Sequence, residues 1–186
     1  AVPETVEIKK STYENLAKVA PEKTIFATNS STMLPSTFME YTGRPEKFLA
    51  LHFANHIWRL NTAEVMGTSK TSPEIFDTIV EFAEEIKMVP IKVLKEQPGY
   101  VLNSLLVPFL NAGAGLLVKG VADPETIDKT WRIATGAPLG PFQIYDIVGL
   151  NTAYNISAAN PSEESQAFAK MLKEQYIDQG KLCLLY

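Results

Sequence analysis

The chain changes character at Glu96-Gln97-Pro98-Gly99, and this change limits what it can fold into. Before this point, apolar strand-like runs alternate with helical patterns, whereas the segments after it all have helical spacing. Alternating strands and helices are typical of an α/β sheet, and consecutive helices are typical of a separate helical layer. We therefore expect an α/β domain over residues 1–95 and an all-α domain over residues 96–186, since 186 residues suffice for two small domains.

The α/β part alternates as follows. The expected elements are helices at 4–20, 33–41 and 73–87, and strands at 24–28, 49–55, 62–67 and 89–94. Ser72 before Pro73 is a typical helix start, and Pro90 indicates either that the last strand lies at an edge of the sheet or that it starts near this residue. The helical part begins with a long apolar segment, residues 100–119, which we expect to be buried on most sides.

Later helices are expected from Asp123, at 142–148 and at 162–178. Ile127 and Trp131 are expected to face inward from the first of these. Gly113 and Gly115 of the long helix do not follow a strand and do not form G-x-G-x-x-G, so they predict a close helix contact rather than phosphate binding.

Polar side chains follow two of the predicted strands. Asn29-Ser30-Ser31-Thr32 comes after the strand at 24–28, and His52 ends the next apolar run. Ligands of α/β sheets bind beyond the carboxyl ends of the strands. Glu64 follows His52 by twelve residues, so two adjacent strands could pair them as a general base and its carboxylate. A structural histidine at a strand end is the alternative, and spacing alone leaves both open.

Composition excludes several classes of protein. Hydrophobic residues make up 46% of the chain and charged residues 20%, as in folded domains, and a net charge of −4 argues against a nucleic-acid partner. The single cysteine, Cys183, excludes an internal disulfide and a multi-cysteine metal site, and we expect no bound metal. Without an apolar run of membrane-spanning length or a signal-peptide pattern at residues 1–4, we expect a cytoplasmic protein with no membrane partner.

Five short motifs occur in a fixed order. They are Asn29-Ser30-Ser31, Leu51-His52-Phe53-x-Asn55, Glu64-Val65, Pro98-Gly99-Tyr100-x-x-Asn103 and Gly140-Pro141-Phe142-x-x-x-Asp146-x-x-Gly149-Leu150. In this order and spacing the chain resembles the L-3-hydroxyacyl-CoA dehydrogenases over residues 1 to about 155, with the bacterial short-chain 3-hydroxybutyryl-CoA dehydrogenases nearest. The resemblance implies that residues 1–95 are the C-terminal part of a Rossmann-type NAD-binding domain, and residues 96–186 a helical substrate-binding and dimerisation domain.

The resemblance also implies a reaction and the residues that perform it. The family interconverts L-3-hydroxyacyl-CoA, here 3-hydroxybutyryl-CoA, and 3-oxoacyl-CoA by hydride transfer with NAD; NADP stays open. His52 matches the histidine that takes the hydroxyl proton, and Glu64 matches the carboxylate that orients it. Ser31 and Asn103 match residues at the substrate oxygens, although Ser31 could instead cap the next helix. An acyl-CoA substrate and a homodimer through the helical domain are implied as partners.

The cofactor side is implied in the same way. Glu4, Lys9 and Asn55 match residues there, together with Ser31; an ordinary exposed ion pair is the alternative for Glu4 and Lys9. The family's G-x-G-x-x-G is absent from the 186 residues. We therefore expect a fragment of a longer enzyme that binds NADH weakly and is inactive alone.

Two further features leave alternatives open. The family often has proline after the asparagine that corresponds to Asn55, whereas His56-Ile57-Trp58 follows here, and Ile57 and Trp58 either pack or line the acyl pocket. The chain could also be a non-catalytic acyl-CoA-binding or dimerisation module. Dehydrogenases that use a lysine on the long helix fit poorly, because that helix has no lysine before Lys119.

Overall fold

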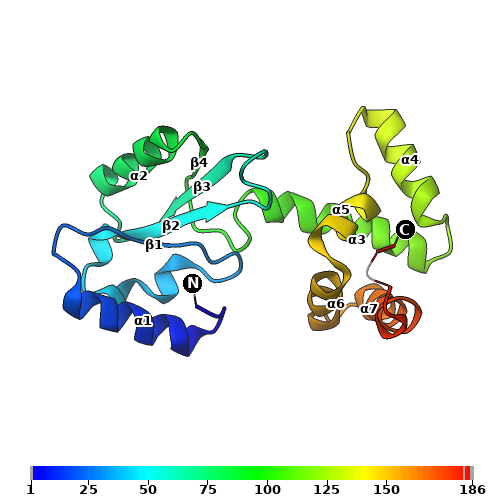
Figure 1. The fold of residues 1–186 in the computed structure, drawn as a ribbon, viewed down its shortest axis with the longest axis horizontal. Coiled ribbons are helices and arrows are strands. Elements are labelled where there is room, and N and C mark those ends of the chain that lie inside the picture. Colours follow the sequence, from blue (N-terminus) through cyan, green and yellow to red (C-terminus); the bar gives the residue numbers. More distant parts are fainter. Residues whose placement is uncertain (1, 182, 185–186) are drawn as a thin grey trace. The chain divides into compact units, whose positions relative to one another are not determined.

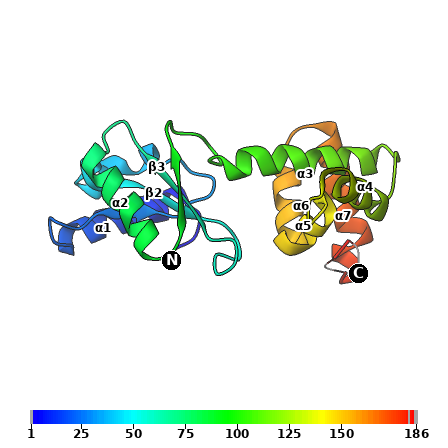
Figure 2. The same cartoon turned by 90° about the horizontal axis from the view of Figure 1, so that it is seen from above.

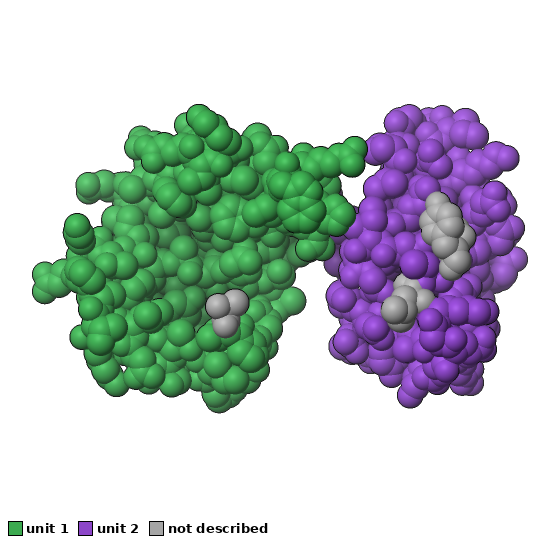
Figure 3. All heavy atoms as spheres, viewed as in Figure 1, with its two compact units in different colours: residues 1–104 green, residues 105–186 purple. Residues whose placement is uncertain are grey.

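A computed structural model describes residues 2–181, 183 and 184 and divides the chain into two compact units, residues 1–104 and 105–186 (Figure 3). The boundary expected after residue 95 concerns the domains of the whole protein and stays a prediction. In the part of the chain that the structure describes, no helix has the length and apolarity needed to cross a membrane.

The first unit is a four-stranded sheet with helices (Figure 1). Its elements are α1 (Val6–Val19), β1 (Phe26–Thr28), β2 (Phe48–Phe53), β3 (Thr62–Gly67), α2 (Pro73–Glu85) and β4 (Val89–Val93). The strand order is β1-β2-β3-β4, with β2 antiparallel to β3 and the other two pairs parallel. β4 therefore lies at an edge of this sheet, as Pro90 predicts, and Ser72 caps α2 by accepting a hydrogen bond from the Ile75 amide at 3.2 Å.

The helix expected at 33–41 is wrong. The chain forms short 3-10 turns instead, at Pro35–Thr37, Met39–Thr42 and Pro45–Lys47. Pro35 keeps the preceding residue extended, and Gly43, with φ of 65°, ends the segment in a left-handed turn. Too few residues remain between these two points to propagate an α-helix.

The sheet is covered on both faces, with α1 and α2 on opposite sides (Figure 1). On one face, residues of α2 pack against β2 and β3. This apolar cluster comprises Leu49, Leu51, Ala63, Val65, Ile79, Val80 and Ala83. On the other face, Tyr13 of α1 packs with Phe26, Phe38 and Phe48. Because successive strand residues alternate in direction, His52 points to the same face as Phe48.

The second unit is helical (Figure 2). α3 (Leu102–Val118) continues into it and is followed by α4 (Pro124–Thr135), α5 (Pro141–Val148), α6 (Leu150–Ala159), α7 (Glu163–Gln175) and a 3-10 turn, Ile177–Gln179. Gly149, with φ of 91°, separates α5 from α6, a helix that the sequence pattern did not predict. The core of the unit is made of Leu110, Ala114, Ile127, Phe142, Tyr145, Leu150, Ala153, Phe168, Leu172 and Leu184.

The packing of α3 differs from the expectation. Only Leu110, Gly113, Ala114 and Gly115 of this helix are buried, so burial on most sides is wrong. Gly113 does mark a close helix contact, because a Cβ there would lie 2.9 Å from the Pro141 ring of α5.

Other side chains of the second unit also depart from the predicted pattern. Trp131, expected to face inward from α4, is 40% exposed. Asp128 is the reverse case, a buried carboxylate that no motif indicated. Its two oxygens each accept a backbone hydrogen bond at 2.8 Å, from Phe142 and from Gln143, at the start of α5.

Candidate active site

The two central strands bring His52 and Glu64 together. The antiparallel register of β2 and β3 pairs the two residues directly. Nδ1 of His52 lies 3.0 Å from Oε2 of Glu64, and each residue is only 3% exposed. The hydrogen-bonded pair predicted from the sequence is present, and it is shielded from water.

The second ring nitrogen of His52 faces Ser31. Nε2 lies 3.0 Å from the Ser31 hydroxyl, which comes from the loop after β1. Asn29 of this loop accepts a hydrogen bond from the Phe53 amide at 2.9 Å, so the loop is tied to the end of β2. The helix that Ser31 could have capped does not form, and the Met33 amide donates to Ser30 Oγ at 3.0 Å instead.

The ring of Tyr100 stacks on the His52 imidazole, a contact that the sequence analysis did not predict. The two rings stack with centroids 4.4 Å apart and planes 9° apart, and Tyr100 is 1% exposed. Its hydroxyl donates a hydrogen bond to the Ser30 carbonyl at 2.7 Å. Burial, followed by the nearby Glu64 carboxylate, raises the pKa of Tyr100, so the hydroxyl stays protonated and remains a donor. The quoted motif contained Tyr100, but nothing in its spacing indicated stacking on the histidine.

Glu64 is fixed by a second set of contacts. Its other oxygen, Oε1, accepts hydrogen bonds from the Val101 and Leu102 amides, both at 2.9 Å. These amides begin α3, where unpaired N–H groups and the helix dipole favour a carboxylate. Oε1 therefore binds the first amides of α3 and Oε2 binds the imidazole of His52. The sequence did not predict the contact with α3.

Glu4 and Lys9 form a pair next to the Ser30-Ser31 loop. Lys9 Nζ lies 3.0 Å from a Glu4 oxygen; the Lys9 side chain is 9% exposed and the Glu4 side chain 42%, so only the lysine end of the pair is buried. The other Glu4 oxygen accepts a hydrogen bond from the Ser30 hydroxyl. Burial alone would raise the pKa of the Glu4 carboxyl, but the hydrogen bonds from Ser30 and Lys9 outweigh it and lower the pKa below its usual value.

The two remaining predicted site residues, Asn55 and Asn103, lie outside the hydrogen bonds around His52. Asn55 is exposed in the turn after β2, and Asn103 is half-buried in the first turn of α3. Within the described residues, neither side chain makes a hydrogen bond to His52 or Ser31. The described part of the chain also contains no cluster of side chains that could hold a metal ion.

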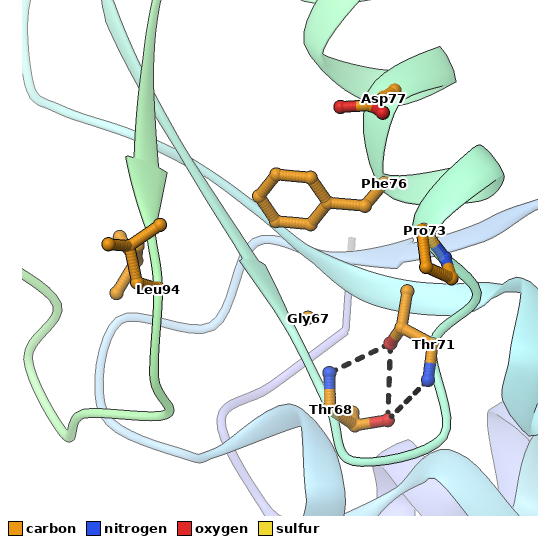
Figure 4. Close-up of a pocket in the computed structure, with 8 residues that line it drawn as sticks. Gly67, Thr68, Thr71, Pro73, Phe76, Asp77 and Leu94 are labelled. Carbon is orange, nitrogen blue, oxygen red and sulfur yellow. Dashed lines mark hydrogen bonds between the residues drawn. The ribbon is translucent and has the colours of Figure 1, made fainter.

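A pocket of about 310 Å³ lies at the far end of the same sheet (Figure 4). Gly67, Thr68, Phe76 and Leu94 line it, and the Thr68 amide donates to the Thr71 hydroxyl at 2.8 Å. Gly67 pairs with Leu49, at the opposite end of β2 from His52. The pocket is therefore separate from the histidine–carboxylate pair.

Fold and site together define the class of protein: a Rossmann-like α/β domain with a buried histidine–glutamate pair, followed by a helical domain. The chain belongs to the 3-hydroxyacyl-CoA dehydrogenase family. The family model "3-hydroxyacyl-CoA dehydrogenase, NAD binding domain" matches residues 1–97, and the model "3-hydroxyacyl-CoA dehydrogenase, C-terminal domain" matches residues 99–183. The first match identifies residues 1–97 as belonging to an NAD-binding domain.

Curated relatives agree with this assignment. The human mitochondrial hydroxyacyl-coenzyme A dehydrogenase is 33% identical over 182 residues, covering 94% of this chain and 58% of the human protein. The 3-hydroxybutyryl-CoA dehydrogenase of Clostridioides difficile is 35% identical over 153 residues, covering 82% of this chain and 54% of that protein. The chain thus spans little more than half the length of these relatives.

Solved structures have the same fold. A diketoreductase, from the structure described as "Substrate-directed dual catalysis of dicarbonyl compounds by diketoreductase", is 65% identical with a TM-score of 0.95, covering 99% of this chain and 65% of that chain. The (S)-3-hydroxybutyryl-CoA dehydrogenase PaaH1 from Ralstonia eutropha is 24% identical with a TM-score of 0.82, covering 98% of this chain and 65% of that chain, and supports the fold alone.

Proposed function

We propose that the intact protein interconverts L-3-hydroxyacyl-CoA and 3-oxoacyl-CoA, with His52 as the general base and acid and 3-hydroxybutyryl-CoA as a substrate. The observation that carries the proposal is the buried His52–Glu64 pair at 3.0 Å in a chain of this family. A buried ionisable pair is costly to maintain, so its presence at a strand end favours a chemical role over a packing role.

The proton is handled by a defined ring nitrogen. Glu64 accepts the Nδ1 proton, so Nε2 carries the lone pair that takes the proton of the substrate hydroxyl. Transfer leaves a positive imidazolium between Glu64 and the substrate, and the carboxylate stabilises that charge. Ser31, 3.0 Å from Nε2, is proposed to hydrogen-bond the same substrate oxygen, and Asn103 to bind the substrate from the first turn of α3.

A bound nicotinamide supplies the hydride acceptor or donor in this reaction. Glu4, Lys9, Ser31 and Asn55 are proposed to line its side of the site. A carboxylate and an ammonium beside a serine loop suit the hydroxyls and amide of a nicotinamide nucleoside. The 186 residues contain no G-x-G-x-x-G, the motif that binds the cofactor pyrophosphate in such domains. We propose that this stretch by itself binds NADH too weakly to saturate.

The second unit is proposed to form a homodimer. An apolar pocket of about 470 Å³ lies between α3 and α4, lined by residues that include Phe109, Leu116, Val121 and Trp131. Leu116, Val121 and Trp131 are 41%, 64% and 40% exposed. Apolar surface gathered in this way is typical of an interface. A non-catalytic dimerisation module would share this surface, but it would have no use for the buried pair in the first unit.

Turnover of 3-hydroxybutyryl-CoA by the intact protein and its His52→Gln variant tests the proposal. We expect His52→Gln to lose activity by about 10²–10⁴-fold, the usual contribution of a positioned base, with an unchanged circular dichroism spectrum. Lys92→Gln is the control, because Lys92 is exposed on β4 and its Nζ lies 3.4 Å from an oxygen of exposed Asp77, away from His52. A fully active His52→Gln enzyme, or a wild-type protein that turns over no 3-hydroxyacyl-CoA, would contradict the proposal.

A further inference from the structure

The loop between β2 and β3 exposes large apolar side chains. Trp58 is 82% exposed, Leu60 59% and Ile57 39%. The alternative in which Trp58 simply packs into the core is therefore wrong. Three such side chains within four residues, left in contact with water, need a reason beyond folding.

The loop is built to hold its shape. The Arg59 and Leu60 amides both donate to the His56 carbonyl at 2.8 Å, which closes a tight turn. The Asn61 side chain donates to the Lys87 carbonyl at 2.8 Å, and this anchors the end of the turn to the chain before β4.

The indole has its own support inside this turn. His56 has a positive φ of 59°, and its ring stacks on Trp58 with centroids 5.2 Å apart and planes 14° apart. The imidazole covers one side of the indole. The tryptophan is therefore supported in a fixed turn while most of its surface stays open.

This loop emerges at the same edge of the sheet as the candidate active site. β1 and β2 are parallel, so the Ser31 loop and the β2–β3 loop both leave the sheet at the carboxyl ends of these strands. His52 lies one residue before the end of β2, and the Asn29–Phe53 hydrogen bond ties the two loops together. The edge thus has polar groups that handle a hydroxyl and, a few residues away, a rigid apolar surface.

We propose that Trp58, with Ile57 and Leu60, contacts the apolar acyl chain of the substrate and determines which chain lengths are used. The inference rests on the proposed function, because it takes His52 as the group that meets the hydroxyl. A 3-hydroxyacyl thioester is polar at its reacting carbon and apolar beyond it, and the same edge of the sheet carries both the polar Ser31–His52 pair and the exposed apolar side chains of the β2–β3 loop. An indole offers a large contact area with few rotatable bonds, so a pre-positioned tryptophan loses little conformational entropy on binding.

The test is a chain-length series on the intact protein. kcat/KM is measured for 3-hydroxyacyl-CoA substrates of increasing length with wild type, Trp58→Ala and Trp58→Phe. Each methylene that contacts the loop is worth about a fourfold change in kcat/KM. We expect the wild type to rise with length, Trp58→Ala to lose on the order of tenfold on chains that add two contacted methylenes, and Trp58→Phe to lie between them. All three should be similar on the shortest substrate.

Val19→Ala is the matched control, because Val19 is 78% exposed on α1 and outside this edge. A Trp58→Ala enzyme with the wild-type chain-length profile overturns the inference. A raised KM for NADH with an unchanged acyl profile also overturns it, since it would place the indole against the nucleotide. Absence of any wild-type turnover would instead contradict the proposed function. The difference in tryptophan fluorescence between the wild type and Trp58→Phe then decides the inference: a shift of this difference spectrum on adding long-chain acyl-CoA supports it, and an unchanged difference spectrum overturns it.

Discussion

Replacing Glu64 by glutamine separates the two tasks of this side chain. Oε1 accepts two amides at the start of α3, and Oε2 accepts the Nδ1 proton of His52. In Glu64→Gln the amide oxygen must face the Val101 and Leu102 amides, because an NH₂ group there would meet two donors. The NH₂ group is then directed at His52, and Nδ1 becomes the acceptor.

This exchange moves the histidine proton to the wrong nitrogen. With Nδ1 accepting from the glutamine, the neutral ring carries its proton on Nε2, which can no longer take the proton of the hydroxyl. The charged imidazolium also loses its carboxylate. Because a positioned general base contributes about 10²–10⁴-fold, we expect kcat for alcohol oxidation to fall by about that factor.

Stability should respond differently from activity. Glu64→Gln keeps an acceptor for the α3 amides, so the free energy of unfolding should change by less than about 1 kcal/mol. Glu64→Ala leaves both amides without a partner, and because water partly reaches Val101 and Leu102, this should cost roughly 1–3 kcal/mol. Glu64→Ala is therefore the variant that loses both activity and stability.

The assay combines two measurements on the intact enzyme. NADH formation from 3-hydroxybutyryl-CoA gives kcat across the pH range, and urea denaturation gives the free energy of unfolding. If kcat of the Glu64→Gln enzyme lay within threefold of the wild-type value across the whole pH range, the tautomer argument would be refuted. Equal stability of Glu64→Gln and Glu64→Ala would refute the role given to Oε1.

Three further predictions follow from the described contacts. Asp128→Ala removes a 4% exposed acceptor of two amides, so urea denaturation should show a loss of about 2–4 kcal/mol, while exposed Asp178→Ala changes little. The lowered pKa of Glu4 means that its contact stabilises the fold above the usual carboxyl pKa of 4.5 and is lost as pH falls through the lower folded value; Lys9→Met should weaken this acid dependence of thermal unfolding. Light scattering should find a dimer at about tens of micromolar, and Trp131→Glu should give a monomer; a wild-type monomer would contradict the interface.

The sequence predicted the parts of the fold that depend on local pattern. Strand alternation, the Ser72 cap and the edge strand with Pro90 rest on one segment each, and the structure confirms them. The His52–Glu64 contact was predictable because β2 and β3 are consecutive strands of one hairpin that pairs the two residues. Helix α6 was missed because Gly149 separates it from α5, and residues 150–159 alone have only a weak amphipathic pattern.

The groups around the dyad could not be predicted, for a different reason. Tyr100 reaches His52, and the Val101 and Leu102 amides reach Glu64, only through the tertiary fold. Neither a stacked ring nor a backbone hydrogen-bond donor can be predicted from the spacing of residues in the sequence. Trp58 shows a related limit: the sequence left open whether this side chain packs or lines the acyl pocket, because residue type alone does not distinguish a packed tryptophan from one that is 82% exposed.

The hairpin that carries the dyad also bears on the order in which the site assembles. His52 and Glu64 are twelve residues apart, whereas the Tyr100–Ser30 hydrogen bond spans seventy residues. By the loop-closure relation, the longer span costs about 1.6 kcal/mol more chain entropy than the shorter one. The base and its carboxylate can therefore meet early in folding, in a local hairpin. The Tyr100 ring stacks on His52 only after the distant segments have docked. Mutations in the hairpin should therefore slow folding, whereas mutations of Tyr100 should mainly speed unfolding.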